Sequence, residues 1–300
     1  MTDPHREVNR MRPPRAGDEP AALGADRLSV VNSAGSPRPL ALVTGASSGI
    51  GLELARVAAE RGHDLVLVAR REEALRALAA EIERDRGTIA HVVSADLAAP
   101  EGPDAVVRAV EDLGIEVDVL VNNAGFGLYG DFLDTDIDVE REMIAVNVVA
   151  PTVFAKAFAR GMVRRGHGRI LNVASTAAFQ PGPRMAVYYA TKAYVLSLSI
   201  ALSIELAGTG VTVTCLAPGP VRTPFRERAR VSASRLFSGE RGMGPEAVAR
   251  AGWAALERGR RLAIPGAWNR VGAAAARGVP LPFAARAVAM LQPAERPPES

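Results

Sequence analysis

The stretch Leu40-Ala41-Leu42-Val43-Thr44-Gly45-Ala46-Ser47-Ser48-Gly49-Ile50-Gly51 decides the fold of this 300-residue chain. Its apolar beginning predicts a buried strand, and the amphipathic segment that continues to Arg61 predicts a helix. The glycines between them permit a tight turn and let the backbone approach a diphosphate, which would lie on the amide groups at the helix N-terminus. A glycine-rich turn alone is weak evidence, but here it has the strand and the helix that a dinucleotide site requires.

The same turn contains the pattern Gly45-x-Ser47-x-Gly49, which also fits the nucleophile elbow of an α/β-hydrolase with Ser47 as the nucleophile. A hydrolase elbow normally follows several strands, and it needs a downstream acid and a histidine. The downstream histidines, His63, His91 and His167, fall in or beside predicted elements rather than in a late loop. The hydrolase interpretation is therefore the weaker alternative.

Beyond this stretch, short apolar runs alternate with segments of helical period, as in a parallel sheet that is covered on both faces. The predicted strands are 40–43, 65–69, 90–95, 117–121, 169–174, 211–216 and 261–264. The predicted helices are 51–61, 72–84, 104–113, 139–165, 187–207 and 245–258. We therefore expect an α/β, Rossmann-like, doubly wound fold, in which residues 39–268 form a single domain around one seven-stranded parallel sheet.

Both ends of the chain lie outside this alternation. Residues 1–38 mix Pro, Gly, Ser, Arg and acidic residues without periodicity, and they predict a disordered tail. Residues 269–300 predict a C-terminal extension that is first helical, rich in Ala and Val, and then disordered. The extension could pack on the core, cover a cleft or meet a partner subunit, and contact with a membrane surface is the least favoured alternative.

Composition and charge exclude several classes of protein. The 36 basic and 33 acidic residues nearly balance, so a nucleic-acid surface is not expected. Cys215 is the only cysteine, which predicts a reducing, cytoplasmic compartment. The four histidines are scattered, so no metal site is expected. A secretory signal is not expected, because the N-terminus has no continuous apolar run behind basic residues. A transmembrane span is not expected either, because the chain lacks a run of about 18 uncharged apolar residues.

The end of the second predicted strand favours NADP(H) over NAD(H). An NAD site usually places Asp or Glu there to bind the ribose hydroxyls, whereas this chain has Ala69-Arg70-Arg71. No carboxylate would repel a 2′-phosphate, and a guanidinium could pair with it. The alternative, two solvated arginines at a helix start, explains the positive charge but not the missing acid.

Tyr188 and Lys192 are four residues apart in a predicted helix, so their side chains lie on one face. Lys192 is unusual, because only it and Lys156 are lysines among the 36 basic residues. A nearby ammonium favours the phenolate and lowers the pKa of a tyrosine from about 10 towards neutrality, where it can serve as a general acid/base. Spacing alone leaves Tyr189 as a rival, and the pair alone equally fits two surface residues at chance spacing.

Other polar residues stand at or near the ends of predicted strands. Asp96 ends the third strand, where it could bind an adenine amino group or form a turn. Asn122-Asn123-Ala124-Gly125 follows the fourth strand, at the edge of the sheet where ligands bind, and its Asn side chains could link neighbouring loops. Asn147 lies in a predicted helix that should kink near Pro151, and Ser175 closes the fifth strand.

In order and interval, these residues resemble the short-chain dehydrogenase/reductase family with the extended cofactor motif Thr-Gly-x-x-x-Gly-x-Gly. The resemblance covers residues 40 to about 225. The matching positions are Thr44 to Gly51, Asp96, Asn122 to Gly125, Asn147, Ser175, Tyr188 with Lys192, Pro218-Gly219 and Thr223. Within the family the chain is most similar to the broad ketoacyl-type reductase group, and this likeness does not identify a substrate.

The resemblance implies an oxidoreductase that reduces a ketone or aldehyde to an alcohol, or the reverse, with a nicotinamide cofactor. Tyr188, rather than Tyr189, would be the general acid/base, and Lys192 would lower its pKa and bind the nicotinamide ribose. Ser175 would hold the carbonyl oxygen, and Asn147 would anchor a relay water. The implied cofactor contacts are Gly45, Ser47, Ser48, Gly49, Ile50, Gly51, Arg70, Asp96, Leu97, Asn123, Ala124, Gly125, Tyr188, Lys192, Pro218, Gly219, Val221 and Thr223.

The resemblance also implies a substrate lid at about residues 220–244 and a homodimer or homotetramer that forms through the helices of Asn147 and Tyr188. The lid is rich in arginine and could attract an anionic acyl thioester, although a solvated lid in an arginine-rich chain is favoured. Its arginines are Arg222, Arg226, Arg228, Arg230, Arg235 and Arg241. A protein that senses NADP without turnover is the rival function, but it would have no use for Tyr188, Lys192 and Ser175.

Overall fold

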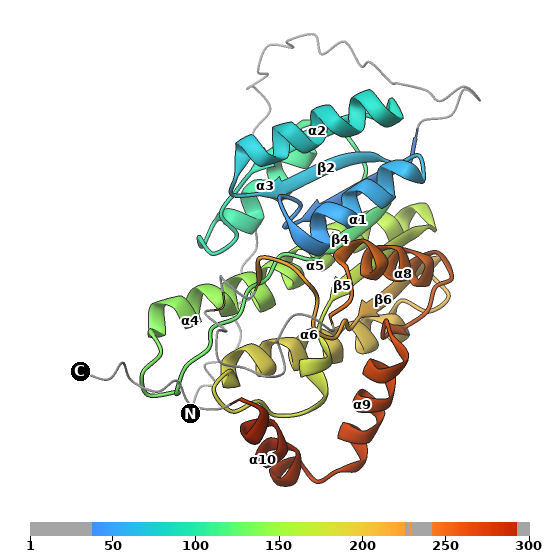
Figure 1. Ribbon diagram of the computed structural model, residues 1–300. Helices are drawn as coiled ribbons and strands as arrows, with labels where there is room; N and C mark the ends of the chain where they lie inside the picture. The colour runs from blue at the N-terminus through green and yellow to red at the C-terminus, as the bar shows by residue number, and fades with distance from the viewer. Residues whose placement is uncertain (1–37, 226–228, 230–241, 293–300) are drawn as a thin grey trace, which may run out of the picture. The chain divides into compact units, whose positions relative to one another are not determined.

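The computed structural model describes residues 38–225, 229 and 242–292. Seven parallel strands form one sheet in the order β3-β2-β1-β4-β5-β6-β7 (Figure 1). The strands are β1 (Leu40–Thr44), β2 (Asp64–Ala69), β3 (Ala90–Ser94), β4 (Val119–Asn122), β5 (Gly168–Val173), β6 (Val211–Leu216) and β7 (Leu262–Ala263). The predicted α/β fold with seven parallel strands is confirmed, with small shifts at the strand ends.

The strand order reverses at β1, which pairs with β2 on one side and with β4 on the other. Leu42 is aligned with Val66 of β2 and with Leu120 of β4, and all three side chains are fully buried. Strands that are buried on both faces need apolar residues at every position, which explains the continuous apolar runs in the sequence. Chains leave β1 and β4 in opposite directions, so a crevice forms at their carboxyl ends.

Two layers of helices cover the sheet, one on each face (Figure 1). The helices are α1 (Gly49–Glu60), α2 (Glu72–Arg86), α3 (Gly102–Asp112), α4 (Ile137–Ile144), α5 (Ala150–Arg165), α6 (Ala186–Glu205) and α8 (Pro245–Glu257), with the short turns η1 (Ala145–Val149) and η2 (Thr176–Phe179). One core joins α1, α2 and α8 to the sheet through side chains such as Leu54, Leu75 and Trp253. The other joins α3 and α5 to the opposite face, with Phe154 and Met162 fully buried.

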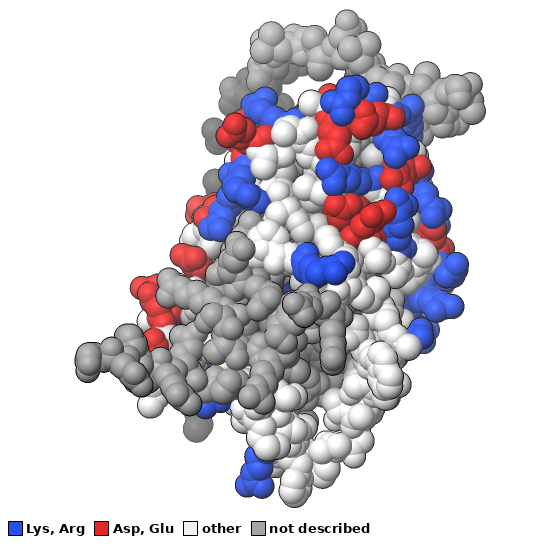
Figure 2. Space-filling model, viewed as in Figure 1, with Lys and Arg blue, Asp and Glu red and all other residues white. Residues whose placement is uncertain are grey.

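Alternating charges cover the outer surface of the first helix layer, where blue and red are interleaved in Figure 2. Arg56 pairs with Glu81 at 2.8 Å between α1 and α2. Arg250 of α8 pairs with Glu60 of α1, also at 2.8 Å. These are exposed or half-exposed pairs that each contribute little to stability, but they show that this face is solvated and balanced in charge.

The predicted helix over 139–165 is interrupted where the sequence led us to expect a kink. Its first part is α4, its last part is α5, and between them η1 is a π-helical turn that contains Asn147. Pro151 has no N–H, so it cannot bond to the carbonyl of Asn147 four residues earlier. The local π-helical geometry widens the turn at this position, as is common at functional sites.

The C-terminal extension forms two helices, α9 (Ala267–Gly278) and α10 (Leu281–Leu291). Pro280 and Pro282 explain the break, since proline is tolerated at a helix start but not in its interior. Residues 1–37 and 293–300 lie outside the described residues, and so do Arg226, Arg228, Arg230, Arg235 and Arg241 of the lid. The predicted domain limits, the disordered tails and the arginine-rich lid therefore stay predictions.

Two helical stretches, Ile137–Arg165 and Ala186–Glu205, have the length and the mean hydropathy, 1.4 and 1.3, that a membrane span requires. Both contain charged residues, so neither is the uncharged apolar run from which a span would be expected. α5 and α6 pack against strands of the sheet, and the core helices of a globular domain pass the same test. The length and hydropathy of these two stretches are therefore weak evidence for a membrane span.

Candidate active site

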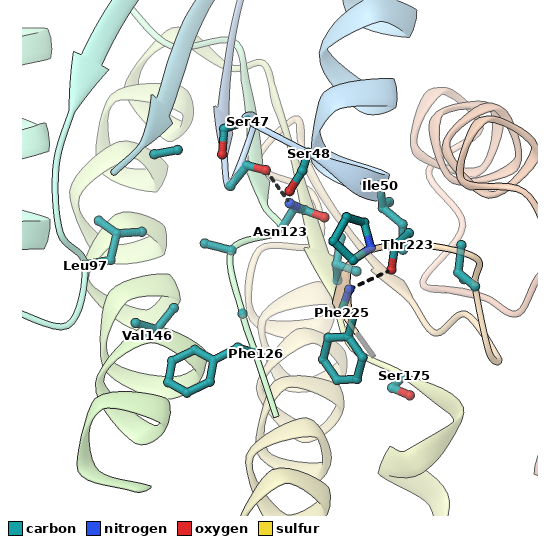
Figure 3. A pocket seen from close by; sticks show the side chains of 18 of the residues that line it. Ser47, Ser48, Ile50, Leu97, Asn123, Phe126, Val146, Ser175, Thr223 and Phe225 are labelled. Atoms are coloured by element: carbon teal, nitrogen blue, oxygen red, sulfur yellow. Dashed lines mark hydrogen bonds between the residues drawn. The ribbon is translucent and has the colours of Figure 1, made fainter. Parts of the chain in front are cut away.

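A cleft of about 550 Å³ opens at the carboxyl ends of the strands, around the glycine turn after β1 (Figure 3). It brings together nearly every residue that the sequence predicted for the site. The predicted residues that line it are Gly45, Ser47, Ser48, Gly49, Ile50, Arg70, Asp96, Leu97, Asn123, Ala124, Gly125, Ser175, Tyr188, Lys192, Pro218, Gly219, Val221 and Thr223. The other two, Gly51 and Asn147, do not line the cleft but contact residues that do.

The glycine turn is shaped by close contact with the loop after β4. Gly45 and Gly49 have φ angles of 68° and 61°, in the left-handed region that favours glycine. A Cβ on Gly45 would lie 2.8 Å from Nδ2 of Asn123. That amide donates to the carbonyl of Thr44 at 2.8 Å and also approaches the carbonyl of Gly45 (Figure 3). The expectation that an Asn side chain links the two loops is confirmed.

The start of α1 fits the diphosphate of a dinucleotide. A Cβ on Gly49 would lie 3.2 Å from Cγ2 of Thr223, so a side chain there would crowd this cleft residue. The first turn of α1 contains no acidic residue. The free N–H groups and the helix dipole at this end therefore favour a bound anion.

Two arginines stand at the end of the cleft beside β2 and β3. Nη1 of Arg70 lies 3.9 Å from a carboxylate oxygen of Asp96. Arg71 donates to the carbonyl of Ser47 at 2.9 Å and to its hydroxyl at 3.2 Å. Arg71 was not among the expected cofactor contacts, although the Arg70-Arg71 pair was the available signal. Asp96 also accepts from the amide of Ala98 at 3.0 Å, so its turn-forming role is present in the structure.

Tyr188 and Ser175 both line the opposite end of the cleft, where the Ser175 side chain acts on the Tyr188 phenol. Ser175 precedes η2, and its hydroxyl accepts from the amide of Ala177 at 3.1 Å. This local cap fixes the Ser175 side chain at the end of β5. Tyr188 is buried near the start of α6, so the phenol reaches the cleft from a rigid helix.

Lys192 lies one turn further along α6 and is also buried. Its Nζ donates to the carbonyl of Val173 at 3.0 Å. A Cβ on Gly125 would lie 3.2 Å from this Nζ and 2.9 Å from Oδ1 of Asn147. Gly125 is therefore small for a physical reason, because Lys192 and Asn147 both approach its backbone.

Asn147 ties the loop after β4 to α6. Its Nδ2 donates to the carbonyl of Phe126 at 2.9 Å and to Oγ1 of Thr191 at 3.0 Å. Its Oδ1 accepts from the amide of Phe126 at 3.1 Å. The side chain is thus occupied in holding the wall behind Lys192, while the Asn147 carbonyl is the one to which Pro151, four residues later, cannot donate.

A model of the short chain dehydrogenase family matches residues 39–233. The chain belongs to this family. A Streptomyces coelicolor protein named provisionally as a ketoacyl reductase is 39% identical over 200 residues, which are 66% of this chain and 76% of that protein. The short-chain dehydrogenase of Sphingobium yanoikuyae, solved in complex with NADPH, has a TM-score of 0.72 and 34% identity over 79% of this chain and 93% of its own.

A third relative is the bulky-bulky ketone specific alcohol dehydrogenase of Comamonas testosteroni. Its crystal structure has a TM-score of 0.68 and 31% identity, and the match covers 79% of this chain and 92% of that one. As a short-chain dehydrogenase, the chain is an oxidoreductase of alcohols and ketones that binds a nicotinamide cofactor. The hydrolase alternative falls with this assignment, and no histidine is among the described residues that line the cleft.

The electrostatics of this short-chain dehydrogenase differ from the sequence-based expectation. Burial raises the pKa of Tyr188 above its ordinary value, and the hydrogen bond with Ser175 opposes this only in part. Burial also lowers the pKa of Lys192 to about 8. The Lys192 ammonium is directed to the carbonyl of Val173 and lies 5.9 Å from the centre of the Tyr188 ring. Tyr188 is thus a protonated phenol at neutral pH, the form that can donate a proton.

The structure also separates Tyr188 from Tyr189. Burial raises the pKa of Tyr189 to about 12, and its hydroxyl accepts from Nε2 of Gln292 at 3.1 Å. Tyr189 does not line the cleft, whereas Tyr188 does. Gln292, at the end of α10, is a neighbour of this region that nothing in the sequence indicated.

The substrate end of the cleft is mostly apolar. Phe126, Val146 and Phe225 point into it beside Ser175 (Figure 3). Glu142 of α4 also lines the cleft and is its one carboxylate besides Asp96 among the described residues. Sequence reasoning missed these side chains, because aromatic and aliphatic residues in loops have no pattern that distinguishes a cleft from a core.

Proposed function

We propose that this short-chain dehydrogenase uses NADPH to reduce a ketone or aldehyde, with Tyr188 as the proton donor. The observation that carries this proposal is the position of the buried Tyr188 phenol, which lies with Ser175 at the end of a cleft that begins at the glycine turn. A dinucleotide on that turn would extend along the cleft towards Tyr188. A protein that only senses NADP would have no need of this arrangement.

The residues divide the work as follows. A bound nicotinamide would supply the hydride. Ser175 would orient the substrate oxygen by a hydrogen bond, and Tyr188 would donate its phenolic proton to that oxygen as the alcohol forms. Lys192, whose amine lies beside Gly125, would bind the nicotinamide ribose. Its positive charge would also stabilise the negative phenolate that Tyr188 becomes when it donates its proton. The carbonyl of Asn147 would anchor a water that relays a proton to Lys192.

The preference for NADP(H) over NAD(H) rests on two guanidinium groups. Arg70 and Arg71 both line the cleft beside Ser47, where the adenosine ribose of a dinucleotide on this turn would lie. A 2′-phosphate would gain charge-assisted hydrogen bonds there. The NADPH in the complex of the Sphingobium yanoikuyae relative supports the proposal.

For the substrate, the described part of the cleft supports a neutral, apolar carbonyl compound. Phe126 and Phe225 offer flat apolar surfaces, and Glu142 would repel an anion. The Comamonas testosteroni relative is named for bulky ketones, whereas the Streptomyces coelicolor relative is named for ketoacyl reduction. The anionic thioester hypothesis rests on six lid arginines, of which all but Arg222 lie outside the described residues, so a direct comparison of the two substrate types is required.

We also propose a homo-oligomer that forms through α5 and α6. Large apolar side chains are exposed or half-exposed on these helices and on the turn before them, and they include Val149, Val163, Ile200 and Ile204. Such a row is typical of a surface that is covered in an oligomer. The cytoplasmic location expected from the lone Cys215 stays a prediction.

The function is tested by a panel of aryl and alkyl ketones, aldehydes and ketoacyl thioesters with NADPH or NADH, followed by the loss of nicotinamide absorbance. We expect turnover of apolar ketones with NADPH, and catalytic efficiency at least about tenfold lower with NADH. An alcohol product must accumulate in step with the oxidised cofactor. NADPH binding without oxidation across the whole panel would overturn the proposal and favour the sensing function.

A further inference from the structure

The C-terminal helices α9 and α10 pack on the domain by one side only. Ala273 of α9 is buried in a cluster with Phe179 and Cys215. Val288 of α10 is buried in the cluster that contains Tyr188 and Tyr189. The inner sides of both helices are therefore buried against the core of the domain.

Their outer sides expose large apolar residues. Trp268 at the start of α9 is 87% exposed, and Met290 near the end of α10 is 74% exposed. From the end of α9 to the first turn of α10, all six residues from Gly278 to Phe283 are exposed. Phe283 itself is 60% exposed. Val271 and Leu281 are also exposed. A soluble surface rarely leaves so many large apolar side chains together, and we call this surface the α9–α10 face.

The α9–α10 face has positive charge and no negative charge. The sequence from Arg258 to Ala294 contains no Asp or Glu. Arg270, Arg277 and Arg286 are all exposed. Arg277 lies over the ring of Phe179 at 4.6 Å, and Arg286 lies over the ring of Phe283 at 5.9 Å. In Figure 2 the surface over these helices is white and blue without red, in contrast to the mixed charges over α1, α2 and α8.

We propose that the α9–α10 face binds the surface of an anionic lipid bilayer. Tryptophan and phenylalanine prefer the boundary between headgroups and acyl chains, and arginines reach the lipid phosphates from the same depth. Negative surface potential attracts the exposed cations of this face. The face thus combines the two attractions, apolar and electrostatic, that stable peripheral binding requires.

A second copy of this chain fits the α9–α10 face less well. A two-fold contact would bring Arg270 and Arg286 of one copy against the same arginines of the other. Neither helix has a carboxylate with which they could pair, so like charges would be buried together. Lipid phosphates supply the missing counter-charge.

The α9–α10 face adjoins the catalytic cleft. Asn269 of α9 packs against Gly219, which lines the cleft, and Gln292 holds Tyr189 beside Tyr188. A bilayer on this face would lie near the substrate end. The binding itself does not depend on the proposed reaction, so it is tested without substrate.

The test is flotation of the full chain with vesicles of equimolar phosphatidylglycerol and phosphatidylcholine, or of phosphatidylcholine alone. We expect the wild type to float with the anionic vesicles and to bind neutral ones at least about tenfold less. The double variants Trp268→Ser/Phe283→Ser and Arg270→Glu/Arg286→Glu should each lose at least about tenfold of the anionic binding. All of these side chains are exposed, so the variants should keep the wild-type melting temperature.

The matched controls are Arg108→Glu on α3 and Leu113→Ser just after α3. Both residues are exposed, and they lie on another surface of the domain. They should float as the wild type does. The proposal is overturned if the wild type does not float, if it binds neutral vesicles equally well, or if the controls lose as much binding. It is also overturned if Trp268→Ser/Phe283→Ser dissociates an oligomer in sedimentation while vesicle binding is unchanged, since a second copy would then cover the face.

Discussion

At one end of the cleft, Tyr188, Lys192 and Asn147 are buried and hydrogen-bonded, whereas at the other end Arg70 and Asp96 have side chains that are 67% and 49% exposed. Asn147 alone makes three hydrogen bonds of about 3 Å. Arg70 has one ion pair at 3.9 Å. The side chains of the catalytic end are therefore held in fixed positions. Those of the adenosine end are charged but are held by few contacts.

This difference indicates which properties each end controls. Proton transfer requires donor and acceptor within hydrogen-bond distance, so small displacements at the catalytic end are costly. Discrimination between two dinucleotides requires only the right charge near a phosphate, and an exposed arginine provides it. Substitutions should thus reduce the rate at one end and shift the cofactor preference at the other.

Apart from loss of the Tyr188 hydroxyl, the largest effect is expected for Lys192→Arg. A guanidinium is broader than an ammonium and does not fit the buried space between Val173 and Gly125. We expect kcat/KM for a reactive ketone to fall by about 10²–10³-fold. Lys156→Arg on the exposed side of α5 is the matched control and should remain within about twofold of the wild type. Equal rates for both variants would contradict a fixed catalytic end.

Arg70→Glu tests the adenosine end. The carboxylate would repel a 2′-phosphate and could accept from ribose hydroxyls, so the ratio of kcat/KM for NADPH to that for NADH should fall by about 10–100-fold. The turnover number with saturating cofactor should change little. Arg108→Glu on α3 makes the same charge change far from the cleft and should leave the ratio unaltered. A ratio that shifts equally in both variants would mean that Arg70 acts only through the net charge.

Gly125→Ala should have a smaller effect at the catalytic end. The new methyl group would lie 2.9 Å from Oδ1 of Asn147 and 3.2 Å from Nζ of Lys192, so one of them must move by a few tenths of an ångström. We expect about a tenfold loss in kcat, with a melting temperature close to that of the wild type. Gly272→Ala in α9, where an added Cβ meets nothing within 4 Å, is the control. Unchanged kcat in Gly125→Ala would show that the catalytic end tolerates displacement.

The pH dependence should be the smallest effect. Burial lowers the pKa of Lys192 from 10.5 to about 8, so its positive charge is present below that pH and is lost as the pH rises through it. The affinity for NADPH should weaken about three- to tenfold between pH 7 and pH 9. Fluorescence titrations measure it, and Lys192→Arg should lack the inflection because arginine stays charged. An inflection that persists in Lys192→Arg belongs to another group.

Most of the fold follows from the sequence because of what a parallel sheet demands. Strands buried on both faces must be apolar throughout, so runs such as Leu65 to Ala69 are recognisable without a structure. Glycine positions are equally informative where the backbone needs them, as at Gly45 and Gly49. The break between α9 and α10 required more, because Pro280 and Pro282 could equally have ended the extension.

The catalytic end was predictable in its residues but not in its electrostatics. The spacing of Tyr188 and Lys192 indicated a pair, yet the pKa of Tyr188 is raised, since burial outweighs the effect of Ser175 and the Lys192 amine lies 5.9 Å from the ring centre. Burial depends on residues far apart in the chain, such as Val288 of α10, and no local pattern reports it. For the same reason the hydrogen bonds from Arg71 to Ser47 and from Gln292 to Tyr189 could not be foreseen.

The most direct test of the central claim compares Tyr188→Phe with Tyr189→Phe. Each substitution removes one hydroxyl from a buried ring of α6, but only Tyr188 lines the cleft. For an apolar ketone with NADPH, we expect Tyr188→Phe to lose about 10²–10⁴-fold in kcat while the dissociation constant of NADPH stays within about twofold. Tyr189→Phe should keep most of the activity. Comparable turnover in Tyr188→Phe and the wild type would contradict the assignment of Tyr188 as the proton donor.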